Sequence, residues 1–263
     1  MLGLHGGPGI DGGQLRYFLR PQATWATVVV PDQRGHGRSS ASSPDKWTLT
    51  QWAADAKSLV DVLGLENVVL IGTSFGGFVV QEYLASYPGH VKGGVVVGAS
   101  PRRASADEIV ARYRGVGGDE PARVMRALMT EPTAAAEQEW DRVCSPLSRR
   151  REPDGALARI VATQTRSPEV NRHFMSSFGD LDLSPKLSSI RDPLLVLVGA
   201  KDPLTPPALA KEIATQSGGD ADFVEVDGAS HQLLWDQPER SDDLLREFAS
   251  RVTSSAAEIS PGS

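Results

Sequence analysis

Ser74 lies in the stretch LIGTSFGG, residues 70–77, which follows an apolar run and precedes a helical pattern. The segment from Gly72 to Gly76 matches the motif G-x-S-x-G, which requires a strand–turn–helix context. The turn must lift the serine hydroxyl above the sheet, and side chains at positions 72 and 76 would collide with neighbouring backbone. The N–H group of Phe75, at the helix start, can then stabilise an oxyanion. The stretch therefore predicts a nucleophilic serine; an ordinary strand–helix turn is the alternative.

A serine hydroxyl is a poor nucleophile at neutral pH and needs a base that is itself held by an acid. Among the five histidines, His231 follows the last predicted strand, at the carboxyl edge where Ser74 also emerges. Asp202 closes the preceding buried strand and is the predicted acid, whereas Asp227 is too close in sequence to His231 and Asp182 lies at the boundary of a helical region. Capping of a following helix is the alternative role for both Asp202 and His231.

The glycine-rich stretch HGGPG occupies residues 5–9. In a site of this kind, a second N–H group for the oxyanion comes from a glycine-rich loop after an earlier strand. We expect Gly7 to supply it, with Gly6 as the alternative, because a residue without a side chain lets a substrate carbonyl approach the backbone. Each such donor typically stabilises the transition state by about 3–4 kcal/mol.

Short runs rich in valine and leucine predict buried parallel strands. Four of them lie at 27–32, 67–72, 91–100 and 193–202, and a more alternating fifth run at 221–228 is placed near an edge. The alternation of strands with helices implies a parallel sheet covered on both faces.

Amphipathic or apolar patterns between and after these runs predict helices at 50–65, 76–88, 206–219 and 239–252. Thr50 is the predicted N-cap of the first helix. The helix over 206–219 begins with prolines and ends with glycines, which is the usual asymmetry of helix termini.

The interval 101–190 breaks this rhythm, because it contains helix-length segments divided by Pro and Gly and no β-branched run. We therefore expect an α/β core formed by 1–100 and 191–252, with 101–190 inserted as a helical cap. The small, polar residues 253–263 predict a disordered tail.

The composition excludes several classes of protein. The 263 residues are 40% hydrophobic and 23% charged, with a net charge of −6, so nucleic acid is not an expected partner. A single cysteine, Cys144, forms no internal disulfide and is expected to pack in a core. No membrane partner is expected, since no apolar run reaches the roughly 18 residues of a membrane span. Without a signal peptide the cytoplasm is the expected location, and the scattered histidines predict no metal site.

The order HGGPG, DQRGHGRS at 32–39, Ser74, Asp202 and His231 resembles the proline iminopeptidase group of the α/β-hydrolases, over nearly the whole chain. The resemblance implies an eight-stranded, mostly parallel sheet, a helical cap between strands six and seven, and no cofactor. It also implies that Asp32, Arg34 and Arg38 brace the glycine-rich loop rather than react.

Members of that group carry further residues before HGGPG that form edge strands, and we expect these N-terminal edge strands to be missing here. Either the start codon was assigned too far downstream or the protein is shortened. The group also has tryptophan after the serine, where this sequence has Phe75, and a glutamate after the triad aspartate, where it has Pro203. A cap glutamate that holds the substrate's amino group is matched locally by Asn171, with Glu169 nearby.

Taken together, the residues predict a serine hydrolase that transfers acyl groups through Ser74, Asp202 and His231, with Gly7 and Phe75 as oxyanion donors. The substrate is expected to be a small molecule or short peptide. Release of an N-terminal residue, such as proline, is the first interpretation, and hydrolysis of small acyl esters or lactones is the alternative. A binding protein of the same fold with impaired catalysis is the third. Dehalogenases and epoxide hydrolases are excluded because they have aspartate at the position of Ser74. The oligomeric state stays open.

Overall fold

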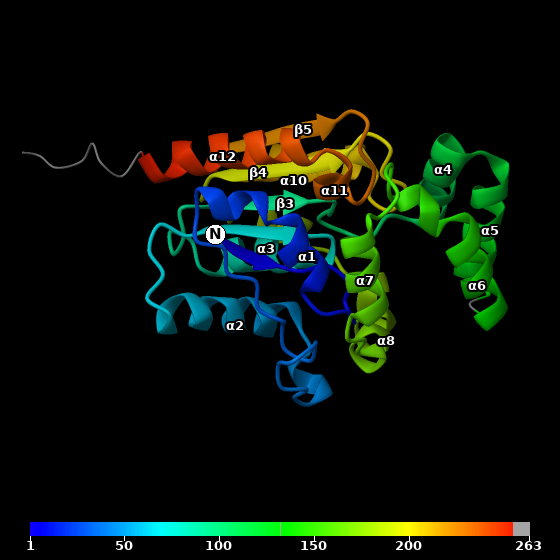
Figure 1. Cartoon of the computed structure of the whole chain (residues 1–263), viewed down its shortest axis with the longest axis horizontal. Helices are drawn as coiled ribbons and strands as arrows, with labels where there is room; N and C mark the ends of the chain where they lie inside the picture. Colours follow the sequence, from blue (N-terminus) through cyan, green and yellow to red (C-terminus); the bar gives the residue numbers. More distant parts are fainter. Residues whose placement is uncertain (132, 255–263) are drawn as a thin grey trace, which may run out of the picture.

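The computed structural model describes residues 1–131 and 133–254. At its centre is a sheet of five strands in the order β1-β2-β3-β4-β5, all of them parallel (Figure 1). The strands are β1 (Leu2–Leu4), β2 (Val69–Thr73), β3 (Gly93–Val97), β4 (Leu194–Gly199) and β5 (Ala221–Val226). Because the strands are parallel, their carboxyl ends meet at one edge of the sheet, and side chains that follow different strands come together there.

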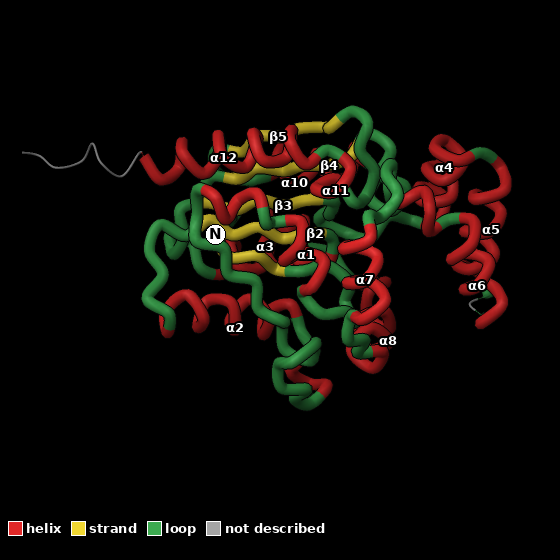
Figure 2. The backbone as a smooth tube through the Cα atoms, viewed as in Figure 1, coloured by secondary structure: helices red, strands yellow, loops and turns green. Residues whose placement is uncertain are grey.

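Helices cover both faces of this sheet (Figure 2). Alternate residues of a strand point to opposite faces: Leu70 belongs to the core shared with helices α2, α3 and α10, whereas Ile71 belongs to the core shared with α1, α11 and α12. Burial of each such side chain stabilises the fold by about 1.5–3 kcal/mol. The helices of the two faces are α2 (Leu49–Val62), α3 (Phe75–Ser86) and α10 (Pro207–Gln216) on one, and α1 (Gly13–Phe18), α11 (Leu233–Asp236) and α12 (Pro238–Ser254) on the other.

Between β3 and β4 the described chain is helical and contains no strand. Its helices are α4 (Ala106–Gly117), α5 (Asp119–Thr130), α6 (Ala134–Val143), α7 (Gly155–Thr163), α8 (Pro168–Ser177) and α9 (Ser184–Leu187), with 3-10 turns at Ser145–Ser148 and Phe178–Asp180. Helices α4, α5 and α6 extend away from the sheet, and α7 and α8 lie beside its carboxyl edge (Figure 1). Further 3-10 turns lie at Pro21–Thr24 and Pro44–Lys46.

Two expectations about local structure are wrong. The segment 27–32 does not form a strand: only Val29 pairs, as an isolated bridge to Leu2, because the neighbouring strand β1 has only three residues with which to form a ladder. The N-cap of α2 is Thr48, whose side chain accepts from the Gln51 N–H, while the Thr50 hydroxyl donates to Glu82. With segment 27–32 reduced to a bridge, the described residues hold five strands and not the eight that the resemblance implied.

The first two residues of the predicted disordered tail are helical. Residues 253 and 254 are the last of α12, and residues 255–263 lie outside the described part of the chain. Among the described helices, none is both long and apolar enough to cross a membrane.

Candidate active site

Ser74 occupies the turn between β2 and α3 with φ 52° and ψ −117°. A non-glycine residue with positive φ is strained and persists only where the surroundings hold it. Here the Ser74 N–H donates to the carbonyl of Val97 at 2.8 Å, and the Ser74 carbonyl accepts from the Gly77 N–H at 2.8 Å. The turn is thus tied to β3 and to the first turn of α3, and the hydroxyl is presented at the carboxyl edge of the sheet.

The glycines on either side of Ser74 are required by close backbone contacts. A Cβ atom on Gly72 would lie 2.1 Å from the carbonyl oxygen of Gly76, and a Cβ atom on Gly76 would lie 2.0 Å from the carbonyl oxygen of Leu4. Since the neighbours are backbone atoms, they cannot give way as a flexible side chain could. This is the collision that the motif predicted, and it explains why G-x-S-x-G needs both glycines.

Asp202 follows β4, and its side chain is fully buried. One carboxylate oxygen, Oδ1, accepts from the N–H groups of Leu204 at 2.8 Å and Thr205 at 2.9 Å. The other, Oδ2, contacts His231 Nδ1 at 2.8 Å. A buried carboxylate is tolerated because both of its oxygens are paired. The carboxylate therefore does order the turn before α10, as the capping alternative suggested, and at the same time binds His231.

His231 follows β5 and is 14% exposed. A carboxylate can only accept, so Nδ1 of the neutral imidazole carries the proton and Nε2 is left as an acceptor. Burial lowers the pKa of His231, but the adjacent Asp202 carboxylate outweighs burial and holds the pKa above its ordinary value. The histidine does not cap the following helix, because α11 has no side-chain cap.

The glycine-rich loop lies directly against Ser74. A Cβ atom on Gly6 would be 3.4 Å from Ser74 Cβ. Within the described part of the chain, the N–H groups of Gly7 and Phe75 donate to no protein acceptor. Gly7, Ser74 and Phe75 also line one cavity, so two unpaired backbone donors lie beside the serine.

His5 supports this loop and is itself unsuited to act as a base. Its Nδ1 donates to the Gly6 carbonyl at 2.9 Å, and its Nε2 accepts from the Gln33 N–H at 3.0 Å. Burial lowers the pKa of His5 to about 4. A neutral imidazole with both nitrogens engaged holds the backbone in place.

Asp32 anchors the chain just after the glycine-rich loop, at Gly12, the residue before α1. Burial acts to raise its pKa, but hydrogen bonds from Gly12, Arg16 and Arg38 outweigh burial and hold the pKa well below its usual range. The bracing role implied for Arg34 is wrong in its detail, because Arg34 forms a bidentate pair with Asp55 on α2 at 2.6 Å and does not contact the glycine-rich loop. No motif in the sequence marks Arg16, because the pairing of α1 with segment 27–32 depends on the tertiary fold.

Gly98 is a second position of the site that no motif in the sequence marks. It follows β3 with φ +58°, and a Cβ atom there would lie 3.3 Å from His231 Nδ1 and 3.4 Å from Asp202 Oδ2. Its carbonyl accepts from the Thr205 hydroxyl at 3.0 Å. The only signal in the sequence was a glycine near the end of the predicted strand 91–100, one position beyond the last residue of β3.

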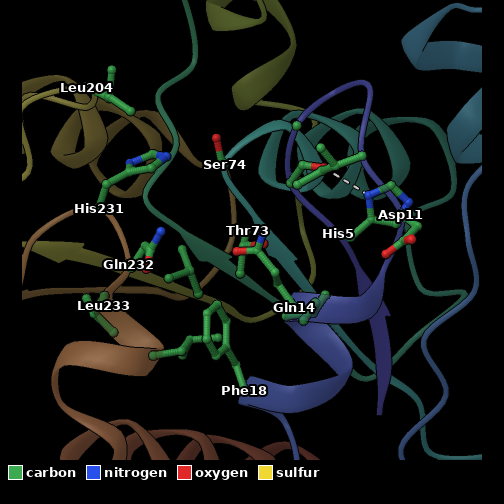
Figure 3. A pocket seen from close by; sticks show the side chains of 16 residues that line it. His5, Asp11, Gln14, Phe18, Thr73, Ser74, Leu204, His231, Gln232 and Leu233 are labelled. Carbon is green, nitrogen blue, oxygen red and sulfur yellow. Dashed lines mark hydrogen bonds between the residues drawn. The ribbon is translucent and has the colours of Figure 1, made fainter. Parts of the chain in front are cut away.

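Two hollows meet at Ser74 and His231. The larger has a volume of about 730 Å³ and the smaller about 290 Å³, and Gly7, Ser74, Leu204 and His231 line both. Figure 3 shows the smaller one, with Ser74 and His231 on neighbouring loops at its rim. No hydrogen bond joins Ser74 to His231 in the described chain, and such bonds commonly tighten only when substrate is bound.

Helices of the 101–190 segment and the first turns of α3 form the wall of the larger cavity. The apolar part of this wall includes Phe75, Phe78, Ile109, Met125, Met129, Phe174 and Phe178. The charged residues that line the cavity, besides His231, are Arg103, Glu137 and Arg172. Glu169 does not line it, and the Asn171 side chain donates to the Pro8 carbonyl at 2.9 Å. Asn171 therefore fastens the glycine-rich loop to α8.

The remaining histidine and cysteine side chains of the described residues are buried or line neither hollow. No group of three or more His, Cys, Asp and Glu residues in 1–131 and 133–254 is arranged to hold a metal ion. Cys144 is buried in the small core of α4, α5 and α6, and burial raises the pKa of its thiol to about 11. This thiol is protonated at neutral pH and packs as a small apolar side chain.

Comparison with known proteins identifies the family of this fold. The sequence model of the alpha/beta hydrolase fold matches residues 1–238. The chain belongs to the alpha/beta hydrolase family. Within that family this hydrolase is similar to proline iminopeptidases: it is 26% identical to proline iminopeptidase PfmaB of Pestalotiopsis fici over 258 residues, which cover 95% of this chain and 90% of the relative.

A relative with a different activity in its name has a similar sequence identity to this chain. A non-heme haloperoxidase of Rhodococcus erythropolis is 28% identical over 214 residues, covering 78% of the hydrolase and 76% of the relative. The crystal structure of a proline iminopeptidase-related protein of Thermus thermophilus superimposes with a TM-score of 0.71 at 27% identity, covering 96% and 89% of the two chains. These comparisons establish the family, and the residues that line the two hollows bear on the substrate.

Proposed function

We propose that this hydrolase cleaves acyl substrates by nucleophilic catalysis at Ser74, with His231 as base and Asp202 as the acid that orients it. The observation that carries the proposal is the 2.8 Å contact between Asp202 Oδ2 and His231 Nδ1, beside a serine on a strained strand–helix turn. These three residue types in this chain order are the arrangement expected for α/β-hydrolases. No metal or cofactor takes part in the proposed chemistry.

In the proposed reaction, Ser74 Oγ attacks the substrate carbonyl carbon while His231 Nε2 takes the hydroxyl proton. The N–H groups of Gly7 and Phe75 donate to the oxyanion of the tetrahedral intermediate. The imidazolium, stabilised by Asp202, returns the proton to the leaving group, and the bond to that group breaks. Water then attacks the acyl-enzyme with the same base, which releases the acid and restores the serine.

We propose further that residues 101–190 act as a cap that selects the substrate. The support is that α5 and α8 contribute Met125, Met129 and Phe174 to the wall of the 730 Å³ cavity above Ser74. Such a cavity suits an apolar acyl group in a small molecule or short peptide, since pockets of this size bury most of a ligand's surface.

Release of an N-terminal residue is the second candidate, and its support is the likeness to proline iminopeptidases. A free α-amino group beside the scissile carbonyl needs a carboxylate partner when it is desolvated. Glu137 is the one acidic residue among those that line the larger cavity, where two arginines accompany it. In the smaller one, the Asp11 carboxylate already accepts from the N–H groups of Gly13 and Thr165. The charges therefore favour esters over unblocked aminoacyl amides.

Two measurements on the purified protein test the proposal. A fluorophosphonate probe should label Ser74, as located by peptide mapping. In parallel assays, hydrolysis of a p-nitrophenyl acyl ester should exceed hydrolysis of prolyl-naphthylamide in kcat/KM. The reverse order, abolished when the α-amine is blocked, would establish the aminopeptidase. A folded protein whose Ser74 resists the probe would support the interpretation as a binding protein.

The rate should depend on pH through His231, which must be neutral to accept the serine proton. Because Asp202 holds the pKa of His231 above 6.5, kcat/KM should rise with pH and reach half of its plateau above 6.5. Below this pH the imidazolium predominates and activity is lost. A pH profile of kcat/KM from about pH 5 to 9 measures the midpoint. A midpoint below 6.5 would contradict the assigned pairing.

A further inference from the structure

The backbone carbonyls of the loop that carries Asp202 are held by side chains from elsewhere in the fold. Arg112 on α4 donates from Nε to the Asp202 carbonyl at 2.7 Å and from Nη2 to the Ala200 carbonyl. The carbonyl between them, that of Lys201, lies 3.0 Å from the Ser230 hydroxyl, which shares its single proton between this carbonyl and that of Leu147. Thus one arginine of the inserted helical segment satisfies two of three consecutive carbonyls next to the carboxylate.

The chemistry of the guanidinium group suits this task. Its rigid, planar fork can donate to two carbonyls at once, and hydrogen bonds from a charged donor are stronger than neutral ones. Arg114, two residues further along the same helix, pairs instead with Asp119, and both of these side chains are more than half exposed. Arg112 has no carboxylate partner within ion-pair distance among the described residues, so its donors are directed to the loop backbone.

Arg112 binds the loop that carries the Asp202 carboxylate, and other backbone hydrogen bonds hold the same loop. The Asp202 N–H donates to the Gly199 carbonyl, and the Lys201 N–H to the Ala229 carbonyl, each at 2.9 Å. These two bonds hold the N–H side of the loop, whereas Arg112 holds its carbonyl side. With the loop fixed on both sides, Oδ2 of Asp202 is presented to His231 Nδ1 at 2.8 Å.

We propose that Arg112 is a positioning residue for Asp202: through it, helix α4 of the cap sets the direction of the carboxylate that holds His231. This inference rests on the proposed function. Arg112 lines neither hollow beside Ser74, so it acts on the reaction through the Asp202 loop and not through contact with substrate. Its removal leaves two carbonyls without donors and lets the loop turn.

The test compares Arg112→Gln with Arg112→Lys and with Arg114→Gln, which makes the same change on the same helix at a surface ion pair. Hydrolysis of the p-nitrophenyl ester gives kcat, KM and the pH profile, and thermal unfolding gives the folded fraction. Arg112→Gln should lower kcat by about 10- to 100-fold, as misplacement of a catalytic group does, with KM within about twofold. Arg112→Lys keeps a charged donor and should recover part of kcat. Arg114→Gln should behave as the parent protein.

A proton NMR spectrum gives a readout that does not depend on turnover. The His231 Nδ1 proton, bound to a carboxylate, should give a far-downfield resonance in the parent protein and in Arg114→Gln. That resonance should be lost or broadened in Arg112→Gln, and the acid limb of kcat/KM should move to lower pH because the carboxylate supports the imidazolium less.

The outcomes separate the two proposals. If the parent protein neither hydrolyses the substrates nor reacts with the fluorophosphonate, the proposed function fails, whatever the spectrum shows. If the parent is active but Arg112→Gln keeps its kcat, pH midpoint and downfield resonance, the positioning role is overturned. A fall in thermal stability alone, with unchanged kcat per folded molecule, would also overturn it.

Discussion

Ser74→Ala is expected to lower kcat by about 10⁴- to 10⁶-fold, since it removes the only atom that forms the acyl-enzyme while the rest of the site remains. Alanine keeps Cβ and the strained backbone of the turn, so the hydrogen bonds of Ser74 with Val97 and Gly77 persist. Fold and cavity should be unchanged, and KM or the affinity for a substrate analogue should stay within a few-fold of the parent value. Steady-state kinetics on the best ester measures the loss.

The matched control is Ser176→Ala, which removes a hydroxyl from the wall of the same cavity. This hydroxyl donates to the His173 carbonyl on the exposed side of α8, and the change should alter kcat by no more than a few-fold. Fluorophosphonate labelling should disappear in Ser74→Ala and persist in Ser176→Ala. Turnover by the Ser74 variant close to that of the parent would refute nucleophilic catalysis at this residue.

Asp202→Asn is expected to lower kcat by about 10⁴-fold, the loss typical when a triad aspartate becomes an amide. The reason lies in the hydrogen bonds of the two carboxylate oxygens. Oδ1 accepts from the Leu204 and Thr205 N–H groups, so the amide oxygen of asparagine must stay there. The NH₂ group then faces His231 and donates to Nδ1, which places the ring proton on Nε2. In that tautomer Nε2 cannot accept the proton of Ser74.

Asp236→Asn provides the control, because Asp236 is another buried carboxylate, at the end of helix α11, which follows His231. It accepts from the N–H groups of Arg150, Arg151 and Ser230, and an amide cannot serve all three donors. This variant should lower the melting temperature yet keep most of kcat in the folded protein. Asp202→Asn should instead retain most of its stability and lose its rate. Equal losses of rate in both variants would show that Asp202 acts through folding alone.

The sequence predicted the strands that are buried on both faces, because such strands appear as short apolar runs bounded by turn residues. The run at 67–72 covers β2 except its last residue, Thr73. The runs at 91–100 and 193–202 contain β3 and β4, and the alternating run at 221–228 contains β5, which pairs with β4 alone. The run at 27–32 has the same composition, yet it makes only one bridge. Strand formation needs a neighbour long enough to pair with, and the composition of 27–32 does not report that β1 has only three residues.

The residues next to Ser74 also predicted the tight turn on which it lies. The glycines at 72 and 76, after a predicted strand, indicate a tight turn in which larger residues do not fit. In the structure, a Cβ atom at either position would lie about 2 Å from a backbone oxygen. Motifs of this kind are short because every atom that clashes lies within a few residues or in the adjoining strand.

The pairing of residues distant in sequence was decided by the tertiary structure alone. Asp202 and His231 meet because β4 and β5 are parallel neighbours that end at the same edge of the sheet. Gly98, Arg16 and Arg112 support the site through contacts across 14 to more than 100 positions of sequence, and no short motif marks them. Hydrogen bonds and steric contacts act over a few ångströms in space, so a sequence shows local ones directly and leaves the others to the fold.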